Sequence, residues 1–417
     1  MAKIRIEGGH KLSGTITISG AKNSAVALIP AAILCDENIT ISNVPDITDV
    51  DDLENILIHL NAKVKRTPGK VEINSSNIKN EEITETLSKK LRASYYFMGA
   101  LLGKFNRVEM YFPGGCNIGS RPINLHLKGF ESLGATVTEE DNHFIIEAKK
   151  LKGSNIYLDF PSVGATINIM LAATKAQGKT IIDNAAEEPE IVNVATFLNN
   201  MGAKIKGAGT STIVITGVKH LHSCFHEVIP DRIQAGTYLI IAALLGKNLK
   251  IDNIIPSHLE ALIAKLTETG VNMEIGLDNI IVKEVKEYNK TDIKTLVYPG
   301  FATDLQQVMA TFLTQCKGKS TIEETIYENR FQNLNELSKM GANVKIRDDN
   351  RKAKIIGKTQ LKGTEVTATD LRGGASLLVA GLVADGITTI DNIQYILRGY
   401  DNIIEKLSKV GAKIEII

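Results

Sequence analysis

The sequence predicts a mixed α/β protein of two pseudo-symmetric domains, each made of three copies of one structural unit. Three observations lead to this fold class. A helix-end signature returns at a step of about seventy residues. Apolar segments almost free of charge lie between these signatures, and alternating apolar residues follow them. We therefore expect six repeats, arranged most simply as two groups of three.

The recurring signature marks the end of a surface helix and the beginning of a strand. It occurs as HLNAKV, SLGATV, NMGAKI, ETGVNM, KMGANV and KVGAKI, with asparagine or glycine at positions 61, 134, 202, 270, 341 and 411. These residue types close helices in the left-handed conformation more readily than others. Each signature therefore predicts a helix before the marked position and a strand after it.

A second helix in each repeat is expected to be buried on nearly all sides, because its sequence carries almost no charge. The six segments span 21–34, 91–103, 162–173, 231–246, 302–313 and 371–384. Their starts have diverged to Lys22, Arg92, Ser162, Asp231, Asp304 and Arg372. Because a helix start attracts anions, the cations there indicate an anion-binding site. Ordinary caps and solvated charges are the alternative.

Composition excludes several classes of protein. The 417 residues contain 48 Lys+Arg and 47 Asp+Glu, for a net charge of +1, which argues against a broad nucleic-acid-binding face. No apolar run approaches the ~18 residues of a membrane helix, and the N-terminus lacks the apolar core of a signal peptide. The four cysteines lie far apart, without metal-ligand spacing. We expect a protein of the reducing cytoplasm with neither nucleic acid nor membrane as partner.

Four loops carry residues suited to chemistry. In PGGCNIGSRP (113–122), glycines flank Cys116, and the nearby Arg121 would lower the thiol pKa. The alternative is a small buried packing residue. SGAKNSA presents Lys22 with Asn23, and ILRGY presents Arg398, all able to donate to an anion. In YPGFATD, Asp304 is either a helix cap or a general base.

Taken together and in order, the motifs SGAKNSA, LRAS, PGGCNIGSRP, PSVGAT, PDRI, YPGFATD, ENRF and RGYDNI resemble the UDP-N-acetylglucosamine 1-carboxyvinyltransferases, a family of enolpyruvyl transferases. The resemblance covers essentially the whole chain. It implies an inside-out α/β barrel of two domains, 21–229 and 1–20 with 230–417, and an active site in the cleft between them. It implies no cofactor, no metal ion and no required oligomer.

The resemblance also implies a reaction, in which the 3′-hydroxyl of UDP-N-acetylglucosamine attacks C2 of phosphoenolpyruvate and phosphate then leaves. The catalytic residues would be Cys116, Asp304, Lys22 and Arg398. The residues that bind phosphoenolpyruvate would be Lys22, Asn23, Arg121 and Arg398. The nucleotide sugar would contact Asn23, Arg92, Arg121, Pro122, Ile123, Asn124, Leu125, Ser162, Val163, Gly164, Asp304 and Ile326. Residues 112–122 would close as a lid, and the epoxide fosfomycin would label Cys116.

The sequence departs from the family pattern at two positions of interest. Asn124 stands where an acid is expected, and Gln234 stands where a glutamate is expected. Two other functions stay open: enolpyruvyl transfer to shikimate 3-phosphate on the same architecture, and an inactive relative that binds UDP-N-acetylglucosamine as a sensor. An assay of substrate-dependent phosphate release would separate them.

Overall fold

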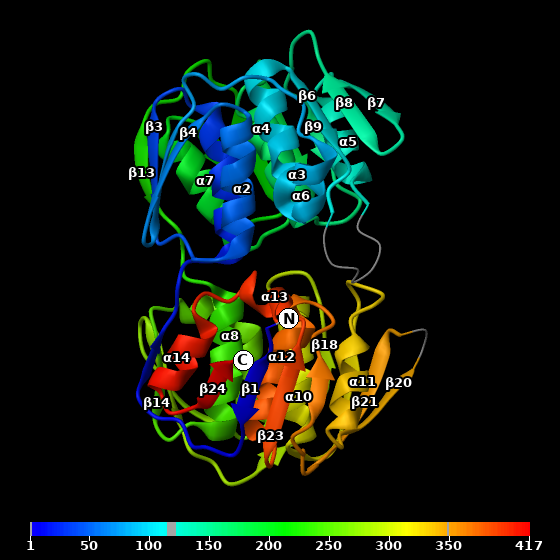
Figure 1. Ribbon diagram of the computed structural model, residues 1–417. Coiled ribbons are helices and arrows are strands. Elements are labelled where there is room, and N and C mark those ends of the chain that lie inside the picture. The colour runs from blue at the N-terminus through cyan, green and yellow to red at the C-terminus, as the bar shows by residue number, and fades with distance from the viewer. Residues whose placement is uncertain (1, 115–121, 348–349) are drawn as a thin grey trace. The chain divides into compact units, whose positions relative to one another are not determined.

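The computed structural model describes residues 2–114, 122–347 and 350–417, which form two compact units (Figure 1). Residues 20–114 and 122–229 make up the first, here called the inserted unit. Residues 2–19 and 230–417 make up the second, the flanking unit. Both names refer to the order of the segments in the sequence.

The inserted unit contains three sheets and seven α-helices among its described residues. The strands are β3 (Asn38–Ser42), β4 (Lys63–Thr67), β5 (Lys70–Asn74), β6 (Arg107–Tyr111), β7 (Thr136–Glu140), β8 (His143–Glu147), β9 (Asn155–Tyr157), β10 (Lys179–Asp183), β11 (Lys204–Lys206), β12 (Thr212–Thr216) and β13 (Cys224–Glu227). The helices are α1 (Lys22–Ala31), α2 (Thr48–His59), α3 (Glu85–Lys90), α4 (Tyr96–Phe105), α5 (Asn124–Ser132), α6 (Val163–Ala173) and α7 (Pro189–Asn200).

The described part of the flanking unit likewise contains three sheets and seven α-helices. Its strands are β1 (Ile4–Glu7), β2 (Thr15–Thr17), β14 (Leu249–Asp252), β15 (Asn272–Ile275), β16 (Asn279–Lys283), β17 (Tyr288–Asn289), β18 (Ile293–Lys294), β19 (Cys316–Glu323), β20 (Asn343–Arg347), β21 (Lys352–Gly357), β22 (Glu365–Thr367), β23 (Ile387–Asp391) and β24 (Lys413–Ile416). Its helices are α8 (Arg232–Leu245), α9 (Glu260–Glu268), α10 (Thr303–Thr314), α11 (Gln332–Lys339), α12 (Leu371–Val383), α13 (Gln394–Leu397) and α14 (Ile403–Lys409).

The six repeats predicted from the sequence are confirmed. In the first five, a buried helix is followed by a strand, a surface helix and two further strands; α6, β10, α7, β11 and β12 are one example. In the sixth, only β24 follows the surface helices, and β1 supplies the remaining strand. The sheets share one topology as well. In the sheet β11-β12-β10-β9, the pair β9–β10 is parallel and the two other pairs are antiparallel, and β4-β5-β3-β13 repeats this pattern. The sheets stay open, so the described residues of neither unit form a closed barrel of strands.

The predicted helix ends are also confirmed. All six marked positions have a positive φ, between 68° at Asn61 and 104° at Gly411. Glycine adopts such angles without strain because it has no Cβ, and asparagine tolerates them better than most other residues. The strands expected after these positions follow directly, for example β4 after Asn61 and β24 after Gly411.

The charge-poor helices lie inside their units, as expected. In the inserted unit, α4 packs against α1 and α6, and in the flanking unit α8, α10 and α12 pack against one another. Every residue of α6 except Val163 is buried, and each unit has its own continuous hydrophobic core. Three buried helices enclosed by three small sheets form the inside-out α/β arrangement predicted above. No helix in the described part of the chain is both long enough and apolar enough to cross a membrane.

The sequence did not show which strands pair, although the resemblance placed residues 1–20 in one domain with 230–417. Strand β2 precedes α1 along the chain, yet it pairs in parallel with β14 of the flanking unit. Conversely, β13 precedes α8 but pairs with β3 of the inserted unit. The chain passes from one unit to the other at Gly20, where a Cβ would lie 1.7 Å from the carbonyl oxygen of Asn43. Only glycine fits at this crossing.

Candidate active-site residues in the two units

Asp304 lies at the centre of a buried ionic cluster in the flanking unit. It is the second residue of α10, whose N-cap is Ala302, so the interpretation of Asp304 as a helix cap is wrong. Its Oδ1 accepts a hydrogen bond from Nη2 of Arg330, and its Oδ2 accepts one from Nη2 of Arg372 at 3.0 Å. The carboxylate side chain is 26% exposed, whereas both arginine side chains are only 3% exposed. The partly exposed carboxylate is therefore held by two buried cations.

Neighbouring polar groups fix both arginines. Arg330 Nε donates to Thr303 Oγ1 at 3.3 Å. The start of α12 is capped by Asp370, whose Oδ1 accepts from the N–H of Arg372 at 2.9 Å. Asp370 also lies 3.9 Å from Nη1 of Arg330. Because Thr303 and Asp370 hold the guanidinium of Arg330, and Asp370 fixes the start of the helix that carries Arg372, the position of the Asp304 carboxylate is fixed as well.

The protonation state of Asp304 follows from this arrangement. Burial alone would raise the pKa of the carboxyl group, but the positive charges of Arg372 and Arg330 outweigh it and hold the pKa of Asp304 well below its usual range. The group is therefore ionised at neutral pH. It can orient a hydroxyl group at once, but it is a weak proton acceptor as long as both arginines bind it.

Ile326 belongs to a loop that the same region organises. Glu324 is 1% exposed, and its Oε1 accepts from the N–H of Ile326 at 2.8 Å and of Tyr327 at 3.2 Å. Its Oε2 accepts from Thr303 Oγ1 at 3.0 Å, next to Asp304. The structure thus brings the loop of Ile326 to the start of α10. Arg398 is half-buried at the end of α13.

In the inserted unit, α1 begins with Lys22, whose ammonium is paired with a buried acid. Nζ of Lys22 lies 2.6 Å from Oδ2 of Asp49, and the two side chains are 11% and 3% exposed. Asp49 comes from the first turn of α2. Asn23 follows Lys22 and is half-buried. The pairing with Asp49 was not foreseen from the sequence, and it fixes the lysine in one place.

Two of the predicted nucleotide-binding segments meet at the start of α6. Ser162 caps this helix, since its Oγ accepts from the N–H of Ala165 at 3.3 Å. A Cβ on Gly164 would lie 2.9 Å from Oη of Tyr95 and 3.0 Å from Cε1 of His126. The first turn of α5 therefore lies directly against that of α6, with Val163 and Gly164 on one side. Pro122 and Asn124 are exposed beside it, Leu125 is half-buried and Ile123 is buried.

His126 belongs to the support of this corner rather than to its chemistry. Its ring nitrogen Nδ1 lies 2.8 Å from Nδ2 of Asn168, and Oδ1 of Asn168 accepts from the N–H of Gly99 at 2.8 Å. Burial, together with the nearby positive charge of Arg92, lowers the pKa of His126 to about 3. The neutral ring thus accepts from Asn168, and Arg92 lies close enough to influence it.

Some predicted residues lie outside the described part of the chain. These are Cys116 and Arg121, and with them most of the expected lid at 112–122. The three other cysteines are described: Cys35 and Cys316 are buried, and Cys224 is half-buried. Burial raises the pKa of all three thiols, to about 11 for Cys224 and to about 12 for Cys316. They are therefore poor nucleophiles.

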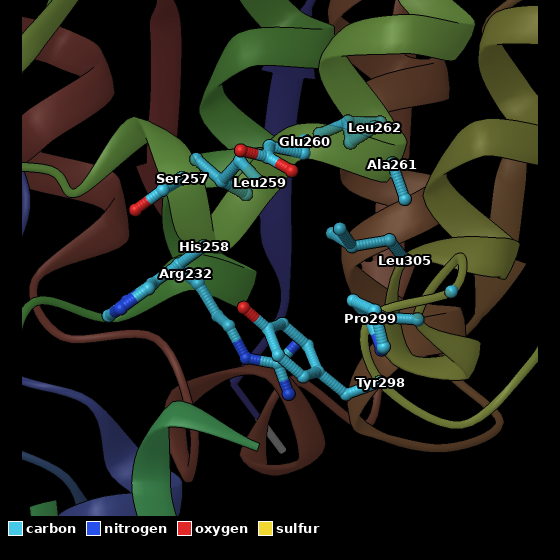
Figure 2. Close-up of a pocket in the computed structure, with 12 residues that line it drawn as sticks. Arg232, Ser257, His258, Leu259, Glu260, Ala261, Leu262, Tyr298, Pro299 and Leu305 are labelled. Atoms are coloured by element: carbon cyan, nitrogen blue, oxygen red, sulfur yellow. The ribbon is translucent and has the colours of Figure 1, made fainter. Parts of the chain in front are cut away.

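A small hollow opens beside the start of α8 (Figure 2). Figure 2 shows Arg232 next to the ring of Tyr298, and the guanidinium carbon lies 5.4 Å from the ring centre. Pro299 and Leu305 line the opposite side. The hollow holds about 20 Å³, room for about one water molecule. It is too small for either substrate, although Leu305 follows Asp304 directly.

Comparison with known proteins identifies the family. The family model described as EPSP synthase (3-phosphoshikimate 1-carboxyvinyltransferase) matches residues 6–407. The chain belongs to the EPSP synthase family. Within this family it is 54% identical over 412 residues to UDP-N-acetylglucosamine 1-carboxyvinyltransferase 2 of Listeria monocytogenes serotype 4b, covering 99% of this chain and 97% of that protein. The protein of the same name from Bacillus subtilis is 52% identical over 415 residues, covering 99% and 96%.

Two solved structures agree with the fold. The enolpyruvyl transferase NikO from Streptomyces tendae matches with a TM-score of 0.89 and 26% identity, over 100% of this chain and 98% of that one. An EPSP synthase from Acinetobacter baumannii matches with a TM-score of 0.77 over the full length of both chains. At 17% identity, that second likeness concerns the fold alone.

The sequence analysis did not single out several residues of the Asp304 cluster and of the Lys22–Asp49 pair. Arg330 was present only as part of the motif ENRF, and neither Asp49 nor Asp370 stood out. Asp49 is the acid that pairs with Lys22, and a cation at a helix start calls for such a partner when it is buried. Gln234 is buried in α8, and its amide atoms make no hydrogen bond within the described residues.

Proposed function

We propose that this protein transfers the enolpyruvyl group of phosphoenolpyruvate to the 3′-hydroxyl of UDP-N-acetylglucosamine and releases phosphate. This reaction is the first committed step of peptidoglycan synthesis, and we place it in the cytoplasm. The observation that carries the proposal is the 54% identity to the Listeria monocytogenes protein over 99% of this chain. Identity at that level is far above the 17% shared with the Acinetobacter baumannii EPSP synthase.

The ionic cluster at Asp304 supports a role for this residue at the attacking hydroxyl. An ionised carboxylate accepts a hydrogen bond from a hydroxyl group and draws its proton as the new C–O bond forms. Without substrates, the charges of the two arginines make the Asp304 carboxylate a weak base. We propose that the carboxylate and phosphate of phosphoenolpyruvate compete for guanidinium groups, so that the pKa of Asp304 rises once both substrates are bound.

Lys22, Arg121 and Arg398 are proposed to hold phosphoenolpyruvate. Its carboxylate and phosphate are both anionic, and charge-assisted hydrogen bonds from cationic side chains bind such groups strongly. The pairing of Lys22 with Asp49 supports this role, because it keeps a charged ammonium in a fixed place on the inserted unit. Asn23 would add an amide donor beside it.

Cys116 is proposed to deliver a proton to C3 of phosphoenolpyruvate, or to act as a thiolate in product release. The resulting tetrahedral intermediate loses phosphate from C2 and a proton from C3, which restores the enol ether. The nucleotide sugar is proposed to contact Arg92, Arg121, Ile326 and the two segments 122–125 and 162–164. The exposed Asn124 would accept a hydrogen bond through its amide oxygen in place of an acid.

Phosphate release tests the function directly. Purified protein is incubated with UDP-N-acetylglucosamine and phosphoenolpyruvate, and each substrate is omitted in turn. We expect phosphate only when both are present. A parallel reaction with shikimate 3-phosphate in place of the nucleotide tests the sister activity, which the description of the matching family model brings forward. Release with shikimate 3-phosphate alone would replace the proposal, and binding of UDP-N-acetylglucosamine without any turnover would indicate a sensor.

A further inference from the structure

Three metal-ligating side chains converge on one corner of the inserted unit, outside all residues assigned to the reaction. His143 begins β8 and is paired with Tyr111 of β6. Glu109 precedes Tyr111 by two residues, so its side chain emerges on the same face of the sheet. Glu82 is brought to this edge because Ile83 forms a parallel bridge with Met110. Three separate segments therefore meet here, which is why no ligand spacing is visible in the sequence.

The candidate ligand atoms lie close to the separations that a tetrahedral ion requires. Nε2 of His143 lies 3.3 Å from Oε1 of Glu109 and 3.7 Å from Oε1 of Glu82. Ligand atoms of all three residues lie within 4.8 Å of one another. Around a zinc ion with bonds of about 2.0–2.2 Å, neighbouring ligand atoms lie about 3.3–3.6 Å apart. An ion fits between these atoms with only small side-chain movements.

Surrounding contacts hold the ligands in place. The ring of His143 packs against Tyr111 with 4.8 Å between ring centres. Arg107 lies 2.7 Å from Oε2 of Glu109, which leaves Oε1 on the side of the imidazole. Nε2 of His59 lies 2.8 Å from the carbonyl oxygen of Glu82 and fixes that segment. Such supporting contacts orient ligands in protein metal sites.

Charge and access both favour a cation. Two carboxylates face one imidazole, and the nearby positive charge of Arg107 is shared with Glu147 at 3.4 Å. The His143, Glu109 and Glu82 side chains are 22%, 24% and 40% exposed, so an ion can enter from solvent. We propose that His143, Glu109 and Glu82 bind one divalent transition-metal ion, with Zn²⁺ as the preferred ion and water in the fourth position. One imidazole with two carboxylates suits zinc better than calcium or magnesium, which prefer oxygen ligands throughout.

Calorimetric titration of the full-length, chelator-treated protein with zinc chloride at pH 7.5 tests this site. We expect one binding event that His143→Ala removes and that Glu109→Gln weakens about tenfold or more. His220→Ala is the matched control, because His220 is an exposed histidine of the same unit, and it should leave this event intact. Zinc should raise the melting temperature of the parent and of His220→Ala, but not that of His143→Ala.

Two outcomes would overturn the proposal. The first is a parent protein that binds no zinc, in which case the three side chains only contact one another. The second is zinc binding that is unchanged in both His143→Ala and Glu109→Gln, which would place the ion on other groups such as thiols. Glu109→Gln keeps the shape of the side chain, so it remains informative if His143→Ala folds poorly. Enolpyruvyl transfer should be the same in His143→Ala and the parent, so this test is independent of the proposed function.

Discussion

Replacement of Asp304 by asparagine should both destabilise the flanking unit and stop turnover. The substitution keeps the shape of the side chain but removes the charge that faces Arg330 and Arg372. Both guanidinium groups are 3% exposed, so the loss leaves two buried cations with one counter-charge fewer. The variant therefore tests the ionic cluster and the proposed base in a single protein.

The size of the effect follows from the surroundings of the cluster. Removing one partner of a buried ion pair costs about 3–5 kcal/mol. Asp370 still lies 3.9 Å from Arg330, and Asp304 itself is 26% exposed, so we expect the lower end, about 3 kcal/mol. At about 2–4 °C per kcal/mol for a unit of this size, the melting temperature should fall by about 6–12 °C. Turnover should fall by about a hundredfold or more.

The dependence on pH gives the same test a second readout. The pKa of Asp304 is lower in the folded protein than in the unfolded chain, where it is about 3.9. Its stabilising contribution is therefore complete above about pH 5 and is lost as the pH falls through the folded-state pKa. The difference between parent and Asp304→Asn should be constant from pH 6 to 8.

Differential scanning calorimetry measures the melting temperatures of the parent and the variant. Turnover is measured by phosphate release at a temperature well below both. Glu405→Gln is a suitable control, because Glu405 is 60% exposed and pairs only with Lys409 among the ion pairs of the described chain. It should shift stability by less than about 0.5 kcal/mol. A melting temperature of Asp304→Asn equal to that of the control would refute the argument from buried charge, and normal turnover would remove Asp304 from the mechanism.

Three further predictions follow from backbone geometry, thiol burial and histidine burial. Gly270→Ala should cost about 1–2 kcal/mol in urea unfolding, because φ is +93° there although a Cβ would meet no atom closer than 3.9 Å; an unchanged midpoint would contradict this. Cys35 and Cys316 should stay unlabelled by iodoacetamide in the native protein at pH 7.5, as judged by peptide mass spectrometry, since both are buried with a raised pKa; rapid labelling of either would show that the site opens. His126 and His226, whose pKa values burial lowers to about 3 and about 4, should make the inserted unit lose stability as the pH falls below about 6.5, because the unfolded chain then binds more protons. Removing both rings, by His126→Gln with His226→Gln, should flatten the melting temperature between pH 7 and 5, and an equally steep loss in that variant would exclude them as the cause.

The features that the sequence made predictable are local ones. Gly202 and Gly341 have a left-handed backbone conformation because each ends a helix. The neighbouring residues in the sequence are therefore enough to predict it. The buried helices were predictable because an absence of charge over twelve or so residues leaves burial as the stable outcome. Because the same pattern occurs six times, it predicted a fold of six similar repeats.

The features that stayed hidden depend on partners distant in sequence. Asp304 was recognised as a residue of interest, but its type at a helix start is equally that of a cap. What distinguishes it is the pair Arg330, from the loop before α11 of the same repeat, and Arg372, from the next repeat. The same holds for the acid beside Lys22 and for the pairing of β2 with β14, since strand partners leave no mark in the residues of a single strand.

The pairing of β1 with late strands also bears on the order of events during synthesis on the ribosome. All strands of the inserted unit come from one continuous segment, so its sheets can close as soon as β13 has emerged. Strand β1, in contrast, lies between β23 and β24, with Ile4 opposite both Ile390 and Ile416. Strand β1 thus leaves the ribosome long before either of its partners has been made. The inserted unit can therefore fold first, and we expect the sheet around β1 to form only after β24 has been translated.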